Sequence, residues 1–185
     1  MAYHQNTSVA TSKLILGNYK IESAATSAGT YTNLGAGKVN SFAHNITMFD
    51  TQAGNAPDPI EGISDETFTV DFELLEFDSS ALAAISCGAM TSTETTAQST
   101  LIAGGNSTLT PRAFKFTNTR LISGSTKQTI ITVPYATLSA GIGITAKGDE
   151  EGDPINVIPI QIVGKVDVTL SIGTQLFTIT KDLTA

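Results

Sequence analysis

Apolar and polar residues alternate along residues 66–76, and this alternation predicts a long β-strand. The apolar positions are Phe68, Val70, Phe72 and Leu74. They fall on one face of the strand, which is expected to pack on a core, while the polar residues between them fall on the other face. At about 3.3 Å per residue such a strand would span roughly 35 Å, about twice the usual length.

Directly after this strand, the spacing of apolar residues changes from every second residue to the spacing of a helical face. This change predicts a short helix at residues 78–87. Asp78 is a plausible N-cap, and Gly88 is a natural residue to end the helix. Ala81, Leu82 and Ile85 can share one helical face. A long amphipathic strand that leads into a short helix is a structural frame, and it carries no obvious catalytic group.

Further apolar runs, separated by turn-forming residues, predict more strands. They lie at residues 14–21, 31–34, 39–49, 114–121, 129–134, 155–163 and 176–180, with 135–146 a possible addition. Residues 155–163 are apolar on both faces, as expected of a strand that packs on a neighbour as well as on the core. Strands at short intervals with a single helix favour a mainly β fold, either a sandwich or a barrel.

The connecting segments have the composition of turns and loops. Residues 35–38 contain two glycines and are expected to separate two strands. Residues 50–64 contain two prolines and two glycines and are predicted to form a long loop outside the sheet. Residues 91–111, rich in Thr, Ser and Gly, are expected to form an exposed loop with at most a weak edge strand. Residues 1–12 are interpreted as an N-terminal arm, and 13–185 as a single domain.

The composition is poor in charge, with charged residues at 15% against roughly 25% in typical soluble proteins. Either much of the surface is covered by other copies of the chain, or this is a Thr-rich monomer. The net charge of −7, with the ten basic residues scattered, argues against affinity for nucleic acid. The sequence contains no apolar run of 18 residues and no secretion signal, which favours a soluble protein made inside the cell.

Candidate chemical groups are few. Cys87 is the only cysteine, which excludes an intrachain disulfide and a zinc cluster, and it is expected to be a small buried residue. His4 and His44 have no ligand motif beside them and are interpreted as structural. The acidic turn at 149–153 lacks the spacing of an EF-hand loop, and residues 35–38 do not complete a phosphate-binding loop. No enzymatic site, cofactor or metal is therefore expected.

Three parts of the sequence resemble phage tail tube proteins, also called major tail proteins. The first is residues 60–88, IEGISDETFTVDFELLEFDSSALAAISCG, and the second is LGAGKV at residues 34–39. The third is VIPIQI at residues 157–162, followed by QLFTI at 175–179. These segments occur in the same order as in that family.

The resemblance implies a two-sheet β-sandwich or half-barrel with one short flanking α-helix and a long loop between strands. It also implies homo-hexameric rings that stack into a hollow tube for DNA. Residues 39–49 and 66–76 would form a hairpin that lines the channel, with Thr69, Asp71 and Glu73 facing the lumen. The loop at 50–64 would bridge successive rings. Its candidate residues are Asp50, Asn55, Pro57, Asp58, Pro59 and Glu61.

The implied location is the virion tail, and the implied partners are the tail tip or initiator, tape measure and terminator proteins, with DNA as transient cargo. Acidic groups in the lumen would repel phosphates so that DNA slides. Thr69, Asp71 and Glu73 could equally lie on an ordinary solvent-exposed face of the sheet that lines no channel. Two other functions stay open: a tube protein of a contractile injection system that carries proteins, and an Ig-like decoration module on a virion.

Overall fold

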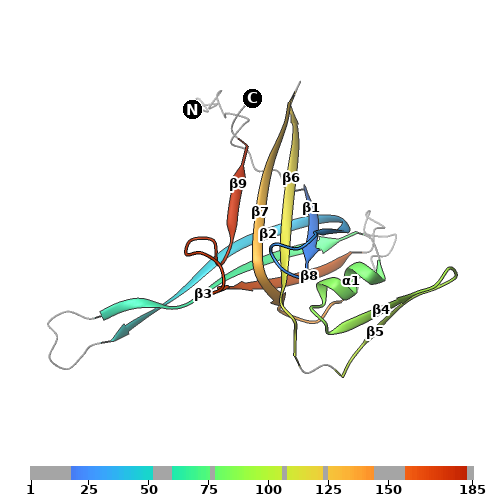
Figure 1. Ribbon diagram of the computed structural model, residues 1–185, viewed down its shortest axis with the longest axis horizontal. Coiled ribbons are helices and arrows are strands. Elements are labelled where there is room, and N and C mark those ends of the chain that lie inside the picture. The colour runs from blue at the N-terminus through green and yellow to red at the C-terminus, as the bar shows by residue number, and fades with distance from the viewer. Residues whose placement is uncertain are drawn as a thin grey trace, which may run out of the picture.

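The computed structural model describes residues 18–51, 60–75, 78–105, 108–122, 125–143 and 157–182. The strands are β1 (Asn18–Ala24), β2 (Thr32–Thr51), β3 (Ile60–Leu74), β4 (Met90–Glu94), β5 (Ser99–Ala103), β6 (Arg112–Ile122), β7 (Ser125–Leu138), β8 (Ile158–Lys165) and β9 (Thr178–Lys181). The one α-helix in these residues, α1, spans Ser79–Ile85 (Figure 1). The mainly β fold with a short flanking helix is thereby confirmed.

The main sheet closes on itself. Its strand order is β6-β1-β2-β3-β8-β7-β9, and β6 also pairs with β7, so the first six strands in that order form an antiparallel barrel. β9 pairs with the part of β7 that β8 leaves free. Closure removes sheet edges within the barrel. The paired β2 and β3, called here the hairpin, extend far beyond it on one side, and β4 and β5 extend on the other (Figure 1).

The core lies inside the barrel and is built from alternate residues of its strands. The largest fully buried side chains on β3 and β6 are Phe72, Leu74, Phe114 and Phe116. Phe72 and Phe116 meet edge to face, with ring centroids 5.7 Å apart. The apolar face predicted for residues 66–76 is therefore the face that packs on the core.

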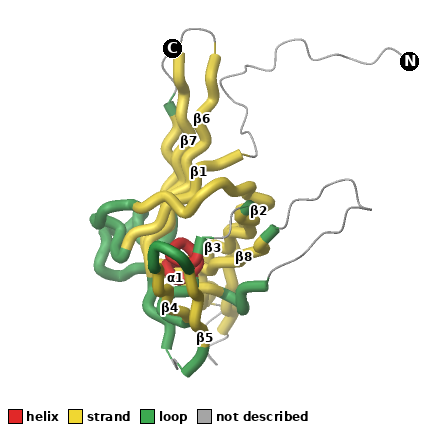
Figure 2. The backbone as a smooth tube through the Cα atoms, turned by 90° about the vertical axis from the view of Figure 1, so that its right-hand side faces the viewer, coloured by secondary structure: helices red, strands yellow, loops and turns green. Residues whose placement is uncertain are grey.

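α1 begins at the predicted N-cap but ends earlier than predicted, with Ser86 as the C-cap and Cys87 at φ +55° before Gly88. The Asp78 carboxylate accepts hydrogen bonds from the backbone N–H groups of Ser80 and Ala81, at 2.8 and 3.1 Å. The apolar face formed by Ala81, Leu82 and Ile85 is buried. Figure 2 shows α1 between the main sheet and the β4–β5 pair. Gly88 follows with φ +89°, a conformation that glycine adopts without strain.

Residues 35–38 do not separate two strands, contrary to the prediction, because β2 is continuous from Thr32 to Thr51. Gly35 has φ +101° and lies where the register between β1 and β2 shifts. A Cβ atom at Gly37 would come within 2.6 Å of Ile21 Cδ1 and 2.9 Å of the Glu73 carbonyl oxygen. The two glycines therefore allow a bulge and close packing inside a strand.

Three other predictions need correction. The predicted loop at 50–64 is partly strand, because β2 reaches Thr51 and β3 starts at Ile60, which leaves only 52–59 outside the described residues. The predicted loop at 91–111 contains β4 and β5, which pair only with each other in the described structure. The strand predicted at 155–163 was expected to pack on both faces, but in β8 only alternate residues are buried, so only one face packs on the core.

β1 is fixed to β6 by a buried carboxylate. Glu22 Oε1 and Oε2 lie 2.8 and 3.1 Å from the ammonium groups of Lys20 and Lys115. Burial raises the pKa of Glu22, but the two lysines outweigh this effect, so the pKa is lowered overall. β1 itself starts at Asn18, and the first part of the strand predicted at 14–21 lies outside the described residues.

Candidate functional surface

The outer face of β2, β3 and β8, which points away from the core, carries a network of polar side chains. Asp71 accepts hydrogen bonds from Ser41 at 2.5 Å and from Gln161 at 2.7 Å. Gln161 in turn accepts a hydrogen bond from Ser139, just beyond β7. Four chain segments that are distant in sequence are thus joined across this face.

Two further hydrogen bonds continue the network along β2 and β3. Asn40 donates to Glu73 at 3.0 Å, and Asn45 donates to Thr69 at 3.1 Å. The carboxylates of Asp71 and Glu73 are therefore oriented by neutral donors. No ion pair involves either of them within the described part of the chain. Lys38 lies opposite Glu73 in the register of β2 and β3, so this polar face carries groups of both charges.

β2 has a long edge to which no other described strand is paired. β1 pairs with β2 only as far as Lys38, whereas β3 pairs with it from Gly37 to Thr51. Along residues 39–51, the side of β2 away from β3 therefore has no strand beside it among the described residues. Unpaired N–H and C=O groups on such an edge can accept another strand.

The inner face of the hairpin continues the apolar face of the core but extends beyond the barrel. Ile46 and Met48 on β2 and Ile63 on β3 lie on this face and are exposed, Met48 to 58%. Large aliphatic side chains gathered on one protruding element usually indicate a contact surface. The outer face of the hairpin is thus mainly polar, whereas its inner face carries exposed aliphatic side chains together with His44 and Glu66.

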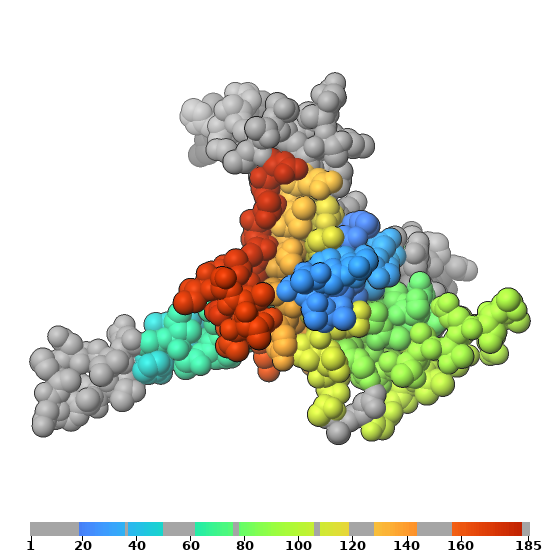
Figure 3. All heavy atoms as spheres, in the orientation of Figure 1, coloured from blue at the N-terminus to red at the C-terminus, as the bar shows by residue number. Residues whose placement is uncertain are grey.

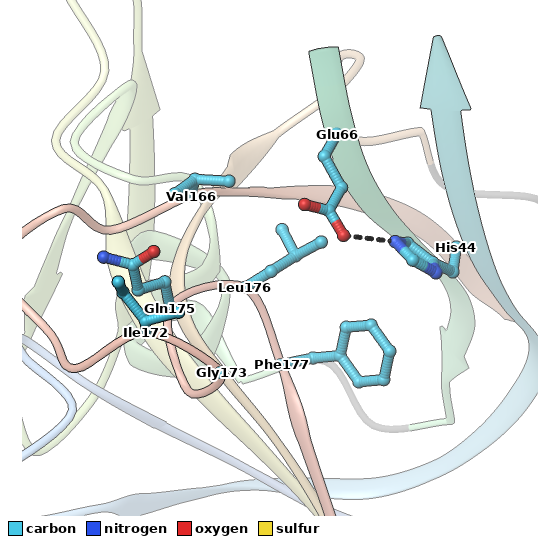
Figure 4. A pocket seen from close by; sticks show the side chains of 8 residues that line it. All are labelled: His44, Glu66, Val166, Ile172, Gly173, Gln175, Leu176 and Phe177. Carbon is cyan, nitrogen blue, oxygen red and sulfur yellow. Dashed lines mark hydrogen bonds and ion pairs between the residues drawn. The ribbon is translucent and has the colours of Figure 1, made fainter. Parts of the chain in front are cut away.

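Residues 166–177, called here the strap, connect β8 to β9 and lie against the base of the hairpin (Figure 3). Leu176 is buried, and Phe177 stacks on Phe68 with ring centroids 4.1 Å apart. Between strap and hairpin is a hollow of about 340 Å³ (Figure 4). Its lining comprises His44, Glu66, Val166, Ile172, Gly173, Gln175, Leu176 and Phe177.

His44 and Glu66 form the polar wall of the hollow. His44 Nε2 lies 2.8 Å from Glu66 Oε1, and the His44 ring meets the edge of Phe177 at 5.3 Å between centroids. Ile172 stands on the rim and is 94% exposed. The His44–Glu66 pair thus joins β2 to β3 at the base of the hairpin.

The structure places the predicted site residues in two groups. Thr69, Asp71 and Glu73 lie together on the outer face, as their alternation predicts. Asp50 and Glu61 are paired in register near the end of the hairpin. The other candidates of the predicted ring-bridging loop, Asn55, Pro57, Asp58 and Pro59, lie outside the described residues. So do His4 and the acidic turn at 149–153.

Sequence reasoning missed the neutral partners of these carboxylates. Asn40 and Ser41 both face outward because the register between β2 and β3 shifts at this point. Gln161 is the one polar residue within the apolar run of β8, and this position could have marked it as a member of the network. The proximity of Glu66 to His44 follows only from the hairpin register.

No family model matches the chain, and no curated protein matches it. Among solved structures, one titled "Crystal structure of Hcp protein" is similar over 89% of this chain and 98% of that chain, at 11% identity and a TM-score of 0.38. At that identity and TM-score, the similarity assigns neither a family nor a function.

The described residues show neither a cluster of metal-ligating side chains nor a helix that could span a membrane. They contain no group of three or more His, Cys, Asp or Glu side chains that could hold a metal ion. No described helix is both long and apolar enough to cross a membrane.

Proposed function

We propose that this protein is a structural subunit whose copies join into rings that stack as a hollow tube. The observation that carries this proposal is the hairpin, which combines an edge at residues 39–51 that no described strand covers with a polar outer face and exposed aliphatic side chains on its inner face. An uncovered strand edge and exposed aliphatic side chains do not stabilise an isolated monomer. A second copy can cover the edge and the apolar side chains.

The open edge explains how copies would join. A strand from a neighbouring copy can extend the β2–β3–β8 sheet by backbone hydrogen bonds. In the proposed ring, the edge of one copy meets a different surface on the next, so the contact is head-to-tail and closes when the rotation allows. The low share of charged residues fits a surface that is largely covered in the assembly.

The outer face of the extended sheet would line the channel. Asp71 and Glu73, both held by neutral hydrogen-bond donors, would face the channel there, and Thr69 adds a hydroxyl group. A wet, negative wall repels phosphate groups at distances up to a Debye length, about 8 Å at physiological ionic strength. Such a wall favours passage of DNA over retention.

The finer proposal is a phage tail tube protein in the virion, with hexameric rings and DNA as cargo, acting without enzymatic activity. It follows from the order of the segments 34–39, 60–88 and 157–179, which resembles that family. The tail tip or initiator, tape measure and terminator proteins would be its partners. A tube that passes protein but excludes DNA would instead favour the injection-system function.

Sedimentation velocity across a concentration series tests the proposal. We expect a subunit at low concentration and very large particles above a threshold, since ring closure and stacking are cooperative. A single small species at every concentration, with and without an extract that contains tail tips, would contradict the proposal.

A further inference from the structure

The strap is held in a fixed shape by hydrogen bonds within it. The backbone N–H of Asp167 donates to the carbonyl oxygen of Gln175 at 2.9 Å, which joins the two ends of the strap. Two turns lie between them, because the Leu170 N–H donates to the Asp167 carbonyl at 3.1 Å and the Thr174 N–H donates to the Ser171 carbonyl at 3.0 Å. The strap is therefore a preorganised loop.

This loop presents two large aliphatic side chains to solvent. Val168 is 81% exposed and Ile172 is 94% exposed, the two highest values among the large hydrophobic residues that the structure describes. Each occupies the second position of one of the two turns. Burial of these side chains against another surface would remove them from water, and the fixed backbone would lose little conformational freedom. The strap is therefore suited to contact a partner.

The hairpin carries a matching surface on the same side of the molecule. His44 lines the hollow beside the strap (Figure 4), and Ile46 and Met48 follow it at alternate positions of β2, so the three share a face. Ile63 on β3 lies opposite Met48. Ile46, Met48 and Ile63, called here the aliphatic patch, are each about half exposed. The strap of the same copy therefore does not cover the patch.

We propose that Val168 and Ile172 of one copy pack on the aliphatic patch of a neighbouring copy. The stack of Phe177 on Phe68 holds each strap at the base of its own hairpin, so the strap that reaches the patch comes from another copy. The inference rests on the proposed function, because in a head-to-tail ring each copy supplies one strap and receives another. Both aliphatic surfaces are then covered in every copy.

The charges near these surfaces favour a second copy as the partner. Glu66 Oε1, in the lining of the hollow, lies 2.8 Å from His44 Nε2. The Asp167 carboxylate in the strap accepts hydrogen bonds from the Thr169 backbone N–H at 3.0 Å and from its hydroxyl group at 2.6 Å. Contact between copies therefore leaves neither carboxylate without a partner. The net charge of −7 disfavours an anionic lipid surface or a nucleic acid in this place.

A charge placed on the strap tests the contact in sedimentation velocity. Ile172→Asp is expected to raise the concentration at which assembly begins at least about tenfold, because a carboxylate would be buried among aliphatic groups. The matched control, Ser171→Asp, adds the same charge at the neighbouring exposed position and should assemble as the wild type does. Neither side chain is buried, so both variants should unfold in urea as the wild type does.

The double variant Ile172→Asp/Met48→Lys tests which surface receives the strap. Met48→Lys alone should weaken assembly, as Ile172→Asp does. In the double variant, each contact between copies would place a carboxylate beside an ammonium group, so assembly should recover relative to either single variant and weaken again at high salt. If the double variant shows no recovery, or if Ile172→Asp assembles at the wild-type concentration, the proposal is overturned.

The same measurements separate failure of this contact from failure of the proposed function. If the wild type forms rings or tubes and Ile172→Asp forms them equally well, the contact is wrong and the proposed function stands. If the wild type forms only dimers, which Ile172→Asp separates and the double variant restores, the contact is right and the proposed function fails. Wild-type monomers at every concentration, with and without an extract that contains tail tips, overturn both.

Discussion

Phe68 on β3 and Phe177 at the end of the strap stack nearly parallel, with ring centroids 4.1 Å apart and planes inclined by 17°. This contact fixes the strap to the base of the hairpin at the point where the hairpin leaves the barrel. Phe68 is buried, and its other aromatic neighbour is Phe42, at 6.2 Å. The direction of the hairpin therefore depends on a contact between distant parts of the sequence.

Phe177→Ala is expected to loosen the strap. Phe177 is only half-buried, so the loss of unfolding free energy should be about 2 kcal/mol, roughly half the cost at a fully buried phenylalanine. Urea unfolding measures the change, and limited proteolysis should show new cleavage within 166–177. The control is Ile172→Ala, because Ile172 is exposed on the same strap and should change stability by less than about 0.5 kcal/mol. Equal effects of the two variants would contradict the role of the stack.

Asp78→Ala is expected to destabilise α1, because it removes the acceptor for the N–H groups of Ser80 and Ala81. The loss should be about 1 kcal/mol in urea unfolding, and Asp78→Ser should restore most of it. Hydrogen bonds from the Ser80 side chain and the Ala81 backbone lower the pKa of Asp78. Its stabilisation is thus present above the pKa of the unfolded chain and is lost as pH falls through the lower folded value. If the unfolding free energy of Asp78→Ala falls with decreasing pH as it does in the wild type, this carboxylate does not contribute to the pH dependence of stability.

The Cys87 thiol is expected to react slowly in the folded protein. Its side chain is fully buried, and burial raises the pKa of the thiol, so little thiolate is present near neutral pH. A water-soluble disulfide reagent at pH 8 should modify the native protein at least about 100-fold more slowly than the urea-unfolded protein. Similar rates in the two states would show that this part of the structure opens readily.

Asp71→Lys/Glu73→Lys is expected to form tubes that retain DNA. The substitutions reverse the charge of the outer face without touching the core, so assembly should persist while DNA co-sediments with the tubes, and more so at low salt. The control, Glu94→Lys/Asp182→Lys, makes the same change in net charge away from this face. If both variants retain DNA equally, the two carboxylates do not face the channel.

Replacement of residues 52–59 by an asparagine-glycine pair tests the predicted ring-bridging loop. Thr51 and Ile60 are paired in register, so a two-residue turn can connect them and the subunit should fold with unchanged stability. We expect single rings or very short tubes in electron micrographs. Tubes of normal length would show that these residues do not join rings.

The parts of the fold that were predicted correctly are those specified by local pattern. Alternation placed Phe68, Val70 and Phe72 toward the core, and the spacing after Asp78 gave the helix with its buried face. The same alternation placed Thr69, Asp71 and Glu73 together. Each of these features depends on residues that are close in sequence.

The errors occurred where long-range contacts override local composition. Gly35 and Gly37 were interpreted as a turn, but Ile21 and the Glu73 backbone leave no space for a side chain at Gly37 within the strand. The polar 91–111 segment forms strands because β4 and β5 pair with each other and pack against α1. Closure of the barrel through β6 and β7, and the contact of strap with hairpin, have no local signature.

Negative-stain electron microscopy of the purified wild-type protein, over a series of concentrations, would show whether this chain assembles into a tube. Rings and hollow tubes of uniform width, more numerous at higher concentration, are the predicted result. Particles of subunit size at every concentration, unchanged when tail-tip extract is added to supply an initiator, would contradict the claim that this chain builds a tube.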